Sequence, residues 1–371
     1  MKILSLSYEI TFDDVLLLPS KSNFVIDDDK KKTSLRTNLT KKITLDNPLI
    51  SAPMPQITEA QMAISLAEAG GIGFIHPFQP FNRQLDQVSK VSKKNLKVAA
   101  SVSDLTDKGV KHVGNLLKAG ITLVSVETGN AHNTQTLKFI RTLKSKYNEI
   151  QISAALVVTG DATKELIKAG ADNIRVGIGG GSHCTTRLTT GIGRPQLSAV
   201  KECYIVAKKY KVPVMSDTGI RSSGDISKAL VFGADTVMIG GMFAGTDECP
   251  GNLVTKRGKK YKYSYGMCTD EAMVKDQKKQ TITRDSLKLI IKEKVKMLTD
   301  FSPQKKSNFQ EGVGGLVDYK GSVNSILENL SSGVRRSMWY LGARNIIELR
   351  NKAKVVLVSP NTRLKPSIKY L

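Results

Sequence analysis

The sequence predicts an α/β fold of the (β/α)8, or TIM, barrel type. Four helical stretches end in Ala-Gly or Gly-Ala and run at once into β-branched residues, at 67–76, 117–127, 167–178 and 231–240. A glycine after the last helical turn ends a helix, and short β-branched runs are typical of buried strands. With the strand-like runs between these repeats, a strand recurs roughly every 25 residues, as repeated βα units require.

Eight runs are candidates for the barrel strands: 48–52, 72–75, 96–101, 121–127, 151–158, 173–178, 212–216 and 235–240. Eight βα units fit a closed barrel better than an open doubly wound sheet. The Gly-x-Gly-x-x-Gly turn of a Rossmann fold does not follow the first strand, which also favours the barrel.

We expect a single barrel domain over residues 1–371, with an N-terminal extension at 1–47 and a final helix over 335–353. A long polar insertion at 241–333 follows the eighth strand. An insertion at this place opens on the catalytic face, so we expect it to contain an active-site flap. A partner-binding or disordered excursion is the alternative.

Composition excludes several classes of protein. The four cysteines form no Cys-x-x-Cys pair, which argues against disulfides or zinc and for a cytoplasmic location. No apolar run is long enough for a transmembrane helix. The formal charge is +23, but the lysines are scattered, without interleaved aromatic residues or a nucleic-acid motif. This pattern favours a surface that attracts phosphorylated small molecules over specific nucleic-acid binding.

Three glycine-rich loops follow the last three predicted strands: GIGGGSHCTTR (177–187), SDTGIRSSGD (216–225) and IGGMFAG (239–245). Glycines let backbone N–H groups approach an anion, and Ser182 adds a hydroxyl. The loops after strands seven and eight are the usual phosphate site of this barrel. Together they predict a phosphorylated ligand.

Two side chains in these loops point to chemistry. A lone cysteine is usually a small buried apolar residue, but Cys184 lies in a polar, glycine-rich loop near Arg187, which predicts a nucleophile. Asp217 ends strand seven, where it can accept hydrogen bonds from ribose hydroxyls. A helix N-cap is the alternative role, although Ser222 and Ser223 suit it better.

These loops, with TFDDVLLLPS (11–20) and TEAQMAISLAEAGGIGFIH (58–76), resemble the family of inosine-5′-monophosphate (IMP) dehydrogenases and guanosine-5′-monophosphate (GMP) reductases. The resemblance covers nearly the whole chain and implies an oxidoreductase of purine metabolism. It implies that Cys184 attacks purine C2 to form a thioimidate, which IMP reaches by losing hydride and GMP by losing ammonia. Thr186 and Glu311 resemble the family's proton relay.

The resemblance also implies roles for other residues and an assembly. It implies a homotetramer, a nicotinamide cofactor contacted by Glu127 and Thr128, and a monovalent-cation site, for K⁺, on the carbonyls of Gly179, Gly181 and Cys184. The substrate contacts that it implies are Ser182, Gly219, Gly240 and Gly241 for the 5′-phosphate, Asp217 for the ribose, and Met54 and Met267 for the base.

Individual segments of the sequence bear on the direction of the reaction, and several of them favour a GMP reductase that uses NADPH. Residues 76–100 leave no room for the two regulatory CBS modules of most dehydrogenases, and 189–203 and 265–273 resemble the reductase. The flap lacks the dehydrogenase's water-activating Arg-Tyr pair, its one arginine between Met273 and Glu311 being Arg284.

Other segments favour different outcomes. The segments 58–76, GIRSSGDI and FAGTDECPG resemble the dehydrogenase, so an IMP dehydrogenase using NAD is the alternative. A phosphate-loop binding protein or pseudoenzyme is the third possibility, because several positions depart from the family pattern. These are Pro55 and Glu127 in place of Asp, Leu156 in place of Asn, Thr218 in place of Gly, and Ser264 in place of a phosphate-binding Tyr.

Overall fold

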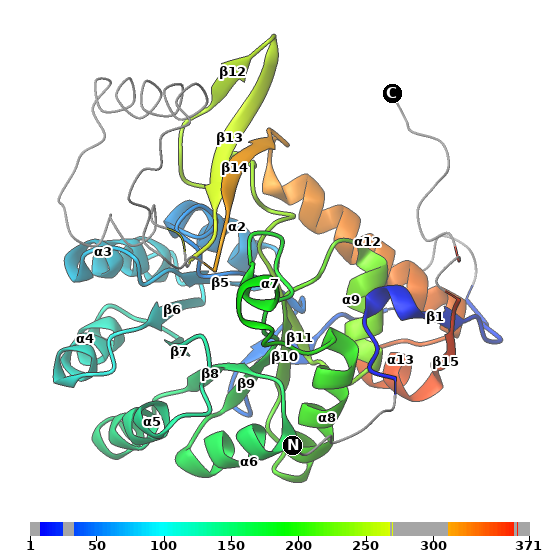
Figure 1. Cartoon of the computed structure of the whole chain (residues 1–371), viewed down its shortest axis with the longest axis horizontal. Coiled ribbons are helices and arrows are strands. Elements are labelled where there is room, and N and C mark those ends of the chain that lie inside the picture. Colours follow the sequence, from blue (N-terminus) through cyan, green and yellow to red (C-terminus); the bar gives the residue numbers. More distant parts are fainter. Residues whose placement is uncertain (1–7, 25–32, 268, 270–310, 360–361, 363–371) are drawn as a thin grey trace.

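Eight parallel strands close into a barrel in the computed structural model, which describes residues 8–24, 33–267, 269, 311–359 and 362 (Figure 1). Each strand overlaps one of the eight predicted runs, so the predicted barrel is confirmed. In order around the barrel they are β4 (Leu49–Ser51), β5 (Ile72–Ile75), β6 (Val98–Val102), β7 (Leu123–Glu127), β8 (Ile152–Val157), β9 (Asn173–Val176), β10 (Val214–Asp217) and β11 (Thr236–Ile239).

Helices follow the strands in turn and surround the barrel (Figure 1). The glycines at 70, 120, 170 and 233 have φ of 81°, 94°, 114° and 119°, which confirms them as the predicted helix ends. The helices after the first seven strands are α2 (Ala60–Glu68), α3 (Phe81–Ser92), α4 (Asp107–Lys118), α5 (Thr134–Lys146), α6 (Gly160–Ala169), α8 (Gln196–Lys209) and α9 (Ser223–Val231), with the short α7 (Thr186–Thr190) before α8.

The last helical region differs from the prediction of one helix over 335–353. The structure has two helices, α12 (Val323–Leu341) and α13 (Ile346–Lys352). Gly342 ends α12 at φ 63°, and the Asn345 side chain caps α13 by accepting the N–H of Glu348. A left-handed glycine followed by an asparagine N-cap is a strong signal for a break between helices.

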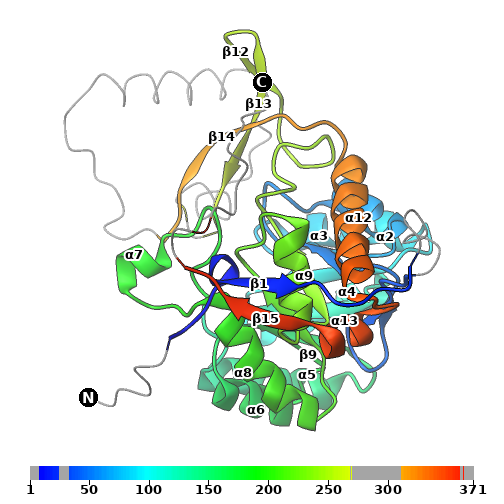
Figure 2. The ribbon, with the colours of Figure 1, turned by 90° about the vertical axis from the view of Figure 1, so that its right-hand side faces the viewer.

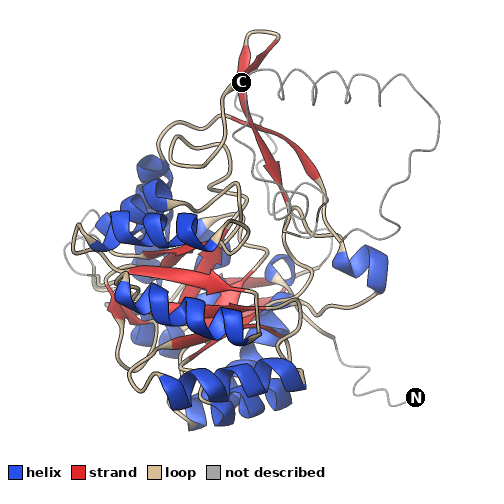
Figure 3. Cartoon of the chain, turned by 90° about the vertical axis from the view of Figure 1, so that its left-hand side faces the viewer, coloured by secondary structure: helices blue, strands red, loops and turns tan. Residues whose placement is uncertain are grey.

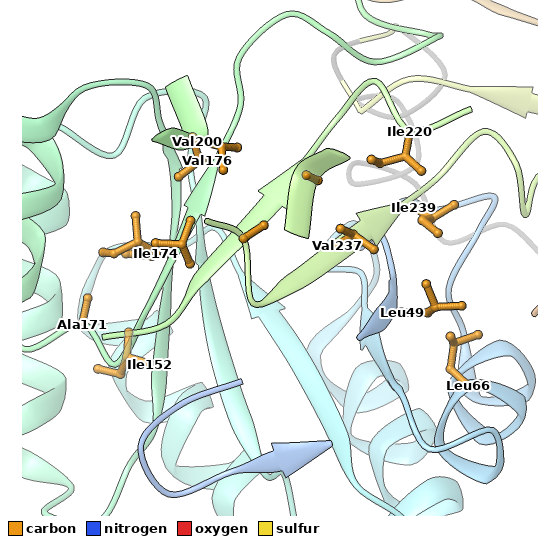
Figure 4. Close-up of a cluster of buried hydrophobic side chains, with 14 of the residues drawn as sticks. Leu49, Leu66, Ile152, Ala171, Ile174, Val176, Val200, Ile220, Val237 and Ile239 are labelled. Carbon is orange, nitrogen blue, oxygen red and sulfur yellow. The ribbon is translucent and has the colours of Figure 1, made fainter. Parts of the chain in front are cut away.

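Alternation along each strand divides the apolar side chains between two cores. Outward residues pack against the helices, and Figure 4 shows Leu49 beside Leu66 of α2 and Val176 beside Val200 of α8. The inward residue Ile50 belongs to a second, smaller core inside the barrel, with Ile72, Phe74, Ala99, Leu123, Met215 and Met238.

Part of the N-terminal extension fills the amino-terminal end of the barrel. The strands β2 (Thr37–Asn38) and β3 (Thr44–Leu45) form a hairpin, and Leu39 and Leu45 from it join the inner core. The side-chain amide of Asn173 donates to the carbonyl of Leu39 at 3.0 Å. The hairpin therefore closes the end of the barrel opposite the predicted site.

Two further sheets lie outside the barrel. The 3-10 turn η1 (Phe12–Asp14) leads into β1 (Val15–Leu18), which pairs antiparallel with β15 (Lys354–Leu357) on the outer surface (Figure 2). The strands β12 (Val254–Lys256), β13 (Lys259–Tyr265) and β14 (Gly314–Asp318) form an antiparallel sheet that projects from the barrel (Figures 1 and 3).

The predicted insertion after strand eight thus contributes β12 to β14, and the flap position of Arg284 lies outside the described residues. The boundaries of the predicted extension and insertion stay predictions. Among the described residues, no helix has both the length and the apolar composition needed to cross a membrane.

We predict that Gly73→Ala destabilises the protein, because a Cβ on this β5 residue would lie 2.4 Å from the Cα of Ala63 in α2. Overpacking of this kind lowers the free energy of unfolding by about 1–3 kcal/mol, which urea denaturation measures. Gly224→Ala is the control, since its Cβ would approach only the Ser222 hydroxyl oxygen, at 3.5 Å. Equal stability of the two variants would contradict the tight contact between α2 and β5.

Candidate active site

A cavity of about 910 Å³ lies at the carboxyl ends of the barrel strands. Its floor comes from residues that end or follow β4, β8, β9, β10 and β11. Residues near β13 and β14, together with α12, complete its wall. This is the end of the barrel at which enzymes of this fold carry out their chemistry.

The three predicted catalytic residues come together in this cavity. The Sγ of Cys184 lies 3.1 Å from the Oγ1 of Thr186, and the Thr186 hydroxyl donates to the Oε2 of Glu311 at 2.6 Å. Backbone contacts hold the arrangement, because Cys184 forms an antiparallel bridge with Gly312 and the N–H of Thr185 donates to the Glu311 carbonyl. A hydrogen-bonded chain from thiol to carboxylate is suited to nucleophile activation and proton transfer.

Arg187 makes hydrogen bonds of its own within the loop that carries Cys184. The sequence placed it near the thiol as a neighbouring cation. In the structure its Nε and Nη2 donate to the carbonyls of Ile178 and Arg194, at 3.3 and 2.5 Å. Arg187 therefore braces the loop that carries Cys184, and the polar contact of the thiol is with Thr186.

The predicted substrate contacts also gather at the cavity. Ser222 caps α9 by accepting the N–H of Asp225, so Asp217 is free of the capping role, as the sequence suggested. The backbone at Gly219 has φ 77°, and a Cβ on Gly241 would lie 2.6 Å from the Ser182 hydroxyl oxygen. The cavity-lining residues include all seven candidates: Met54, Ser182, Asp217, Gly219, Gly240, Gly241 and Met267.

A buried ion network centred on Arg175 forms part of the cavity floor. Alternation along β9 sends this side chain into the barrel, where it is 1% exposed. Its Nη1 donates to the Oε2 of Glu127 at 2.5 Å, and its Nη2 donates to the Oδ2 of Asp217 at 2.7 Å. Burial raises the pKa of the Asp217 carboxyl, and the Arg175 charge opposes this shift. One guanidinium thus orients two carboxylates.

The predicted cofactor residues are placed differently from the substrate residues. Glu127 and Thr128 are not among the residues that line the cavity, and Glu127 is connected to it through Arg175. The Thr128 hydroxyl donates to the carbonyl of Ala155 at 2.7 Å. The Oε1 of Glu127 is buried and has no hydrogen-bond partner in the part of the chain that the structure describes.

The predicted cation ligands line the cavity on the turn that carries the nucleophile. The carbonyl of Gly181 accepts the N–H of Cys184 at 3.1 Å, and Gly179 has φ 75°. A carbonyl oxygen has two lone pairs, so one further contact per carbonyl is possible. The assignment of Gly179, Gly181 and Cys184 to a cation stays a prediction.

Sequence analysis missed the residues through which the N-terminal segment braces the site. Asp13 binds the guanidinium of Arg221 at 2.7 and 2.8 Å, and Arg221 follows β10 and lines the cavity. The ammonium of Lys228 donates to the Phe12 carbonyl at 2.9 Å. The motif around Asp13 was visible in the sequence, but its distant partners were not. Arg175 did leave a local signal, as a charge within an apolar strand.

Three of the residues that depart from the family pattern lie at different places in the structure. Thr218 lines the cavity with φ 96°, a conformation that favours glycine and strains a β-branched residue. Leu156 also lines the cavity. Ser264 is buried in β13, is not among the cavity-lining residues, and its hydroxyl has no hydrogen-bond partner among the described residues. Two of the three substitutions therefore alter the cavity wall itself.

Comparison with known proteins places these observations in a family context. Residues 9–365 match the model of the IMP dehydrogenase / GMP reductase domain. The chain is 33% identical over 408 residues to inosine-5′-monophosphate dehydrogenase of Borreliella burgdorferi, covering 96% of each protein. It is 35% identical over 390 residues to the protein of the same name from Cryptosporidium parvum, covering 94% of this chain and 92% of the relative. A Helicobacter pylori protein of that name is 30% identical over 473 residues, covering 94% of each.

We predict that Arg175→Met lowers the free energy of unfolding by about 3–5 kcal/mol near neutral pH, because it leaves two buried carboxylates without their cation. Without Arg175, burial raises the Asp217 pKa further, so the folded state binds the proton more tightly than the unfolded state. Protonation of Asp217 should therefore restore part of the lost stability as the pH falls through the folded pKa. This restoration should be complete below the ordinary Asp pKa of 3.8. Urea denaturation at about pH 7.5 and about pH 5 tests this, and a deficit that is the same at both would contradict it.

Proposed function

Because the chain belongs to the IMP dehydrogenase / GMP reductase family, we propose that it is an IMP dehydrogenase that uses NAD. The three relatives described above, which it matches over nearly their whole length, carry that name. None of the three names supports the GMP reductase with NADPH that the sequence analysis preferred. The contact from Cys184 through Thr186 to Glu311 supports an enzyme of this family, and the names of the relatives favour the dehydrogenase within it.

That contact bears on the main objection to a dehydrogenase. A dehydrogenase must hydrolyse its covalent intermediate, and the sequence lacks the Arg-Tyr pair expected to activate water. Glu311 is a carboxylate within hydrogen-bond distance of a hydroxyl beside the nucleophile, so it can serve as the general base for that step. The reason for preferring the reductase is thereby weakened.

The length of the chain is also compatible with an IMP dehydrogenase. The alignment with the Cryptosporidium parvum dehydrogenase runs over 390 residues and already covers 92% of that protein. The alignment with the Helicobacter pylori relative needs 473 residues for similar coverage. Proteins named IMP dehydrogenase therefore include chains close to this one in length.

The proposed reaction converts IMP, NAD⁺ and water into xanthosine monophosphate, NADH and a proton. The Cys184 sulfur forms a bond to purine C2, and C2 then loses a hydride to leave a thioimidate. Bound NAD⁺ supplies the hydride acceptor. Water next attacks C2, its proton passes through Thr186 to Glu311, and cleavage of the C–S bond restores Cys184.

The surrounding residues fit this substrate and cofactor. Asp217, held by Arg175, presents a carboxylate to the cavity for ribose hydroxyls. The resemblance assigns Glu127 to the cofactor, and the buried Oε1 of this residue has no hydrogen-bond partner among the described residues. The carbonyls of Gly179, Gly181 and Cys184 would hold a K⁺ ion, which would fix the shape of the catalytic loop. Tetrameric assembly and a cytoplasmic location stay predictions from the sequence.

Absorbance at 340 nm tests the proposed function directly. We expect purified protein to form NADH from IMP and NAD, and Cys184→Ala to lower the rate at least about 10³-fold because the covalent step is lost. Oxidation of NADPH with GMP, and no reaction with IMP, would establish the reductase instead. No change in absorbance with either substrate pair would favour the phosphate-binding protein.

We also predict that Glu311→Gln lowers kcat by about 10²–10⁴-fold, because the general base for hydrolysis is removed. Hydride transfer precedes hydrolysis, so a rapid first turnover of NADH should remain, and stopped-flow absorbance measures it. Thr186→Val should behave similarly. Thr189→Val is the control, since the described hydrogen bonds of the Thr189 hydroxyl go to the backbone carbonyls of Thr185 and Thr186. Loss of the first turnover in Glu311→Gln would show that Glu311 acts before hydrolysis.

A further inference from the structure

Three lysine or arginine side chains line the cavity in the described part of the chain, and two of them are bound to carboxylates. Arg175 is bound to Glu127 and Asp217, and Arg221 is bound to Asp13 and Asp225. The third is Lys320, whose described hydrogen bonds go to backbone carbonyls. A negatively charged ligand would therefore find its least compensated cation at Lys320.

Lys320 lies at the loop that was predicted to hold a phosphate. It follows β14, and its backbone N–H donates to the carbonyl of Gly245 at 3.0 Å. Its ammonium donates to the carbonyls of Gly241 and Met242, at 3.1 and 3.0 Å. An ammonium has three N–H groups, so one remains for a ligand.

A further observation favours an anion at this place. Ser264, which stands where a phosphate-binding tyrosine is usual, is buried and is not among the cavity-lining residues. That position therefore contributes no donor to the cavity.

We propose that Lys320 binds the 5′-phosphate of the nucleotide substrate and provides the positive charge of the phosphate subsite. The glycine-rich loops would donate backbone N–H groups to the same phosphate, and Ser182 its hydroxyl. The identity of the nucleotide rests on the proposed function, but the subsite itself requires only a phosphate monoester. Sequence reasoning missed Lys320 because a single lysine among 56 basic residues carries no local signal.

Titration calorimetry with IMP and with inosine tests the proposal, because the two ligands differ only in the phosphate. Lys320→Met should weaken IMP binding by about 10–100-fold, the usual effect of losing a charge-assisted hydrogen bond. Inosine binding should stay as in the wild type, and Lys320→Arg should keep most of the IMP affinity. Unchanged IMP binding, or equal losses for IMP and inosine, would overturn the proposal.

Lys262→Met is the matched control for a structural role. Lys262 also donates its ammonium to two loop carbonyls, those of Asp247 and Cys249, but it is not among the cavity-lining residues. Its loss should lower the thermal midpoint without changing the ratio of IMP to inosine affinity. If Lys262→Met changed the ratio of IMP to inosine affinity as much as Lys320→Met does, both lysines would have a structural role only, and the proposal would be overturned.

A second measurement separates this inference from the proposed function. If the wild-type protein binds neither IMP nor GMP, the proposed function fails, and inorganic phosphate becomes the probe. At constant ionic strength, phosphate should raise the thermal midpoint of the wild type and not that of Lys320→Met. Equal stabilisation of both proteins, or of neither, would overturn the role of Lys320.

Discussion

Closure of eight parallel strands into a barrel is the constraint on which the rest of this molecule depends. The interior of such a barrel is just wide enough to be filled by side chains, so every inward residue must fit its neighbours in size and charge. Along β7 the inward positions are Leu123, Ser125 and Glu127. Polarity therefore increases toward the carboxyl end, and the apolar lower layer supports a charged upper layer. A charge such as Arg175 is tolerated there because two carboxylates surround it.

Local signals explain how much of the structure could be predicted. β-branched runs and glycine helix ends gave all eight strands, and the glycine-rich loops gave part of the cavity lining, with Asp217 among them. The break at Gly342 was also encoded locally, but an amphipathic pattern on both sides of it concealed the break. The pairing of Asp13 with Arg221 spans 208 residues and involves side chains that are ordinary surface residues in sequence. Such pairs exist only once the barrel has formed.

The choice between the two reactions shows why a missing motif is a weak argument. The sequence lacks one known arrangement for activating water, and this absence favoured the reductase. A base, however, is defined by where a carboxylate lies relative to the reacting atoms. The bridge between Cys184 and Gly312 brings Glu311 next to Thr186 from 125 residues away. The resemblance had already paired Thr186 with Glu311, but the spacing of the two residues in the sequence could not show how close they lie.

Strand β14 links the two ends of the cavity. Glu311 lies shortly before this strand and Lys320 shortly after it. The length of the strand therefore sets the distance between the Thr186–Glu311 pair and the glycine-rich loop at Gly241. Inserting or deleting one residue would shift one group relative to the other by about 3.3 Å and turn the alternate side chains to the opposite face. Its side chains, by contrast, alternate between exposed and half-buried positions. During evolution, the number of residues in β14 should therefore be held more tightly than their identity.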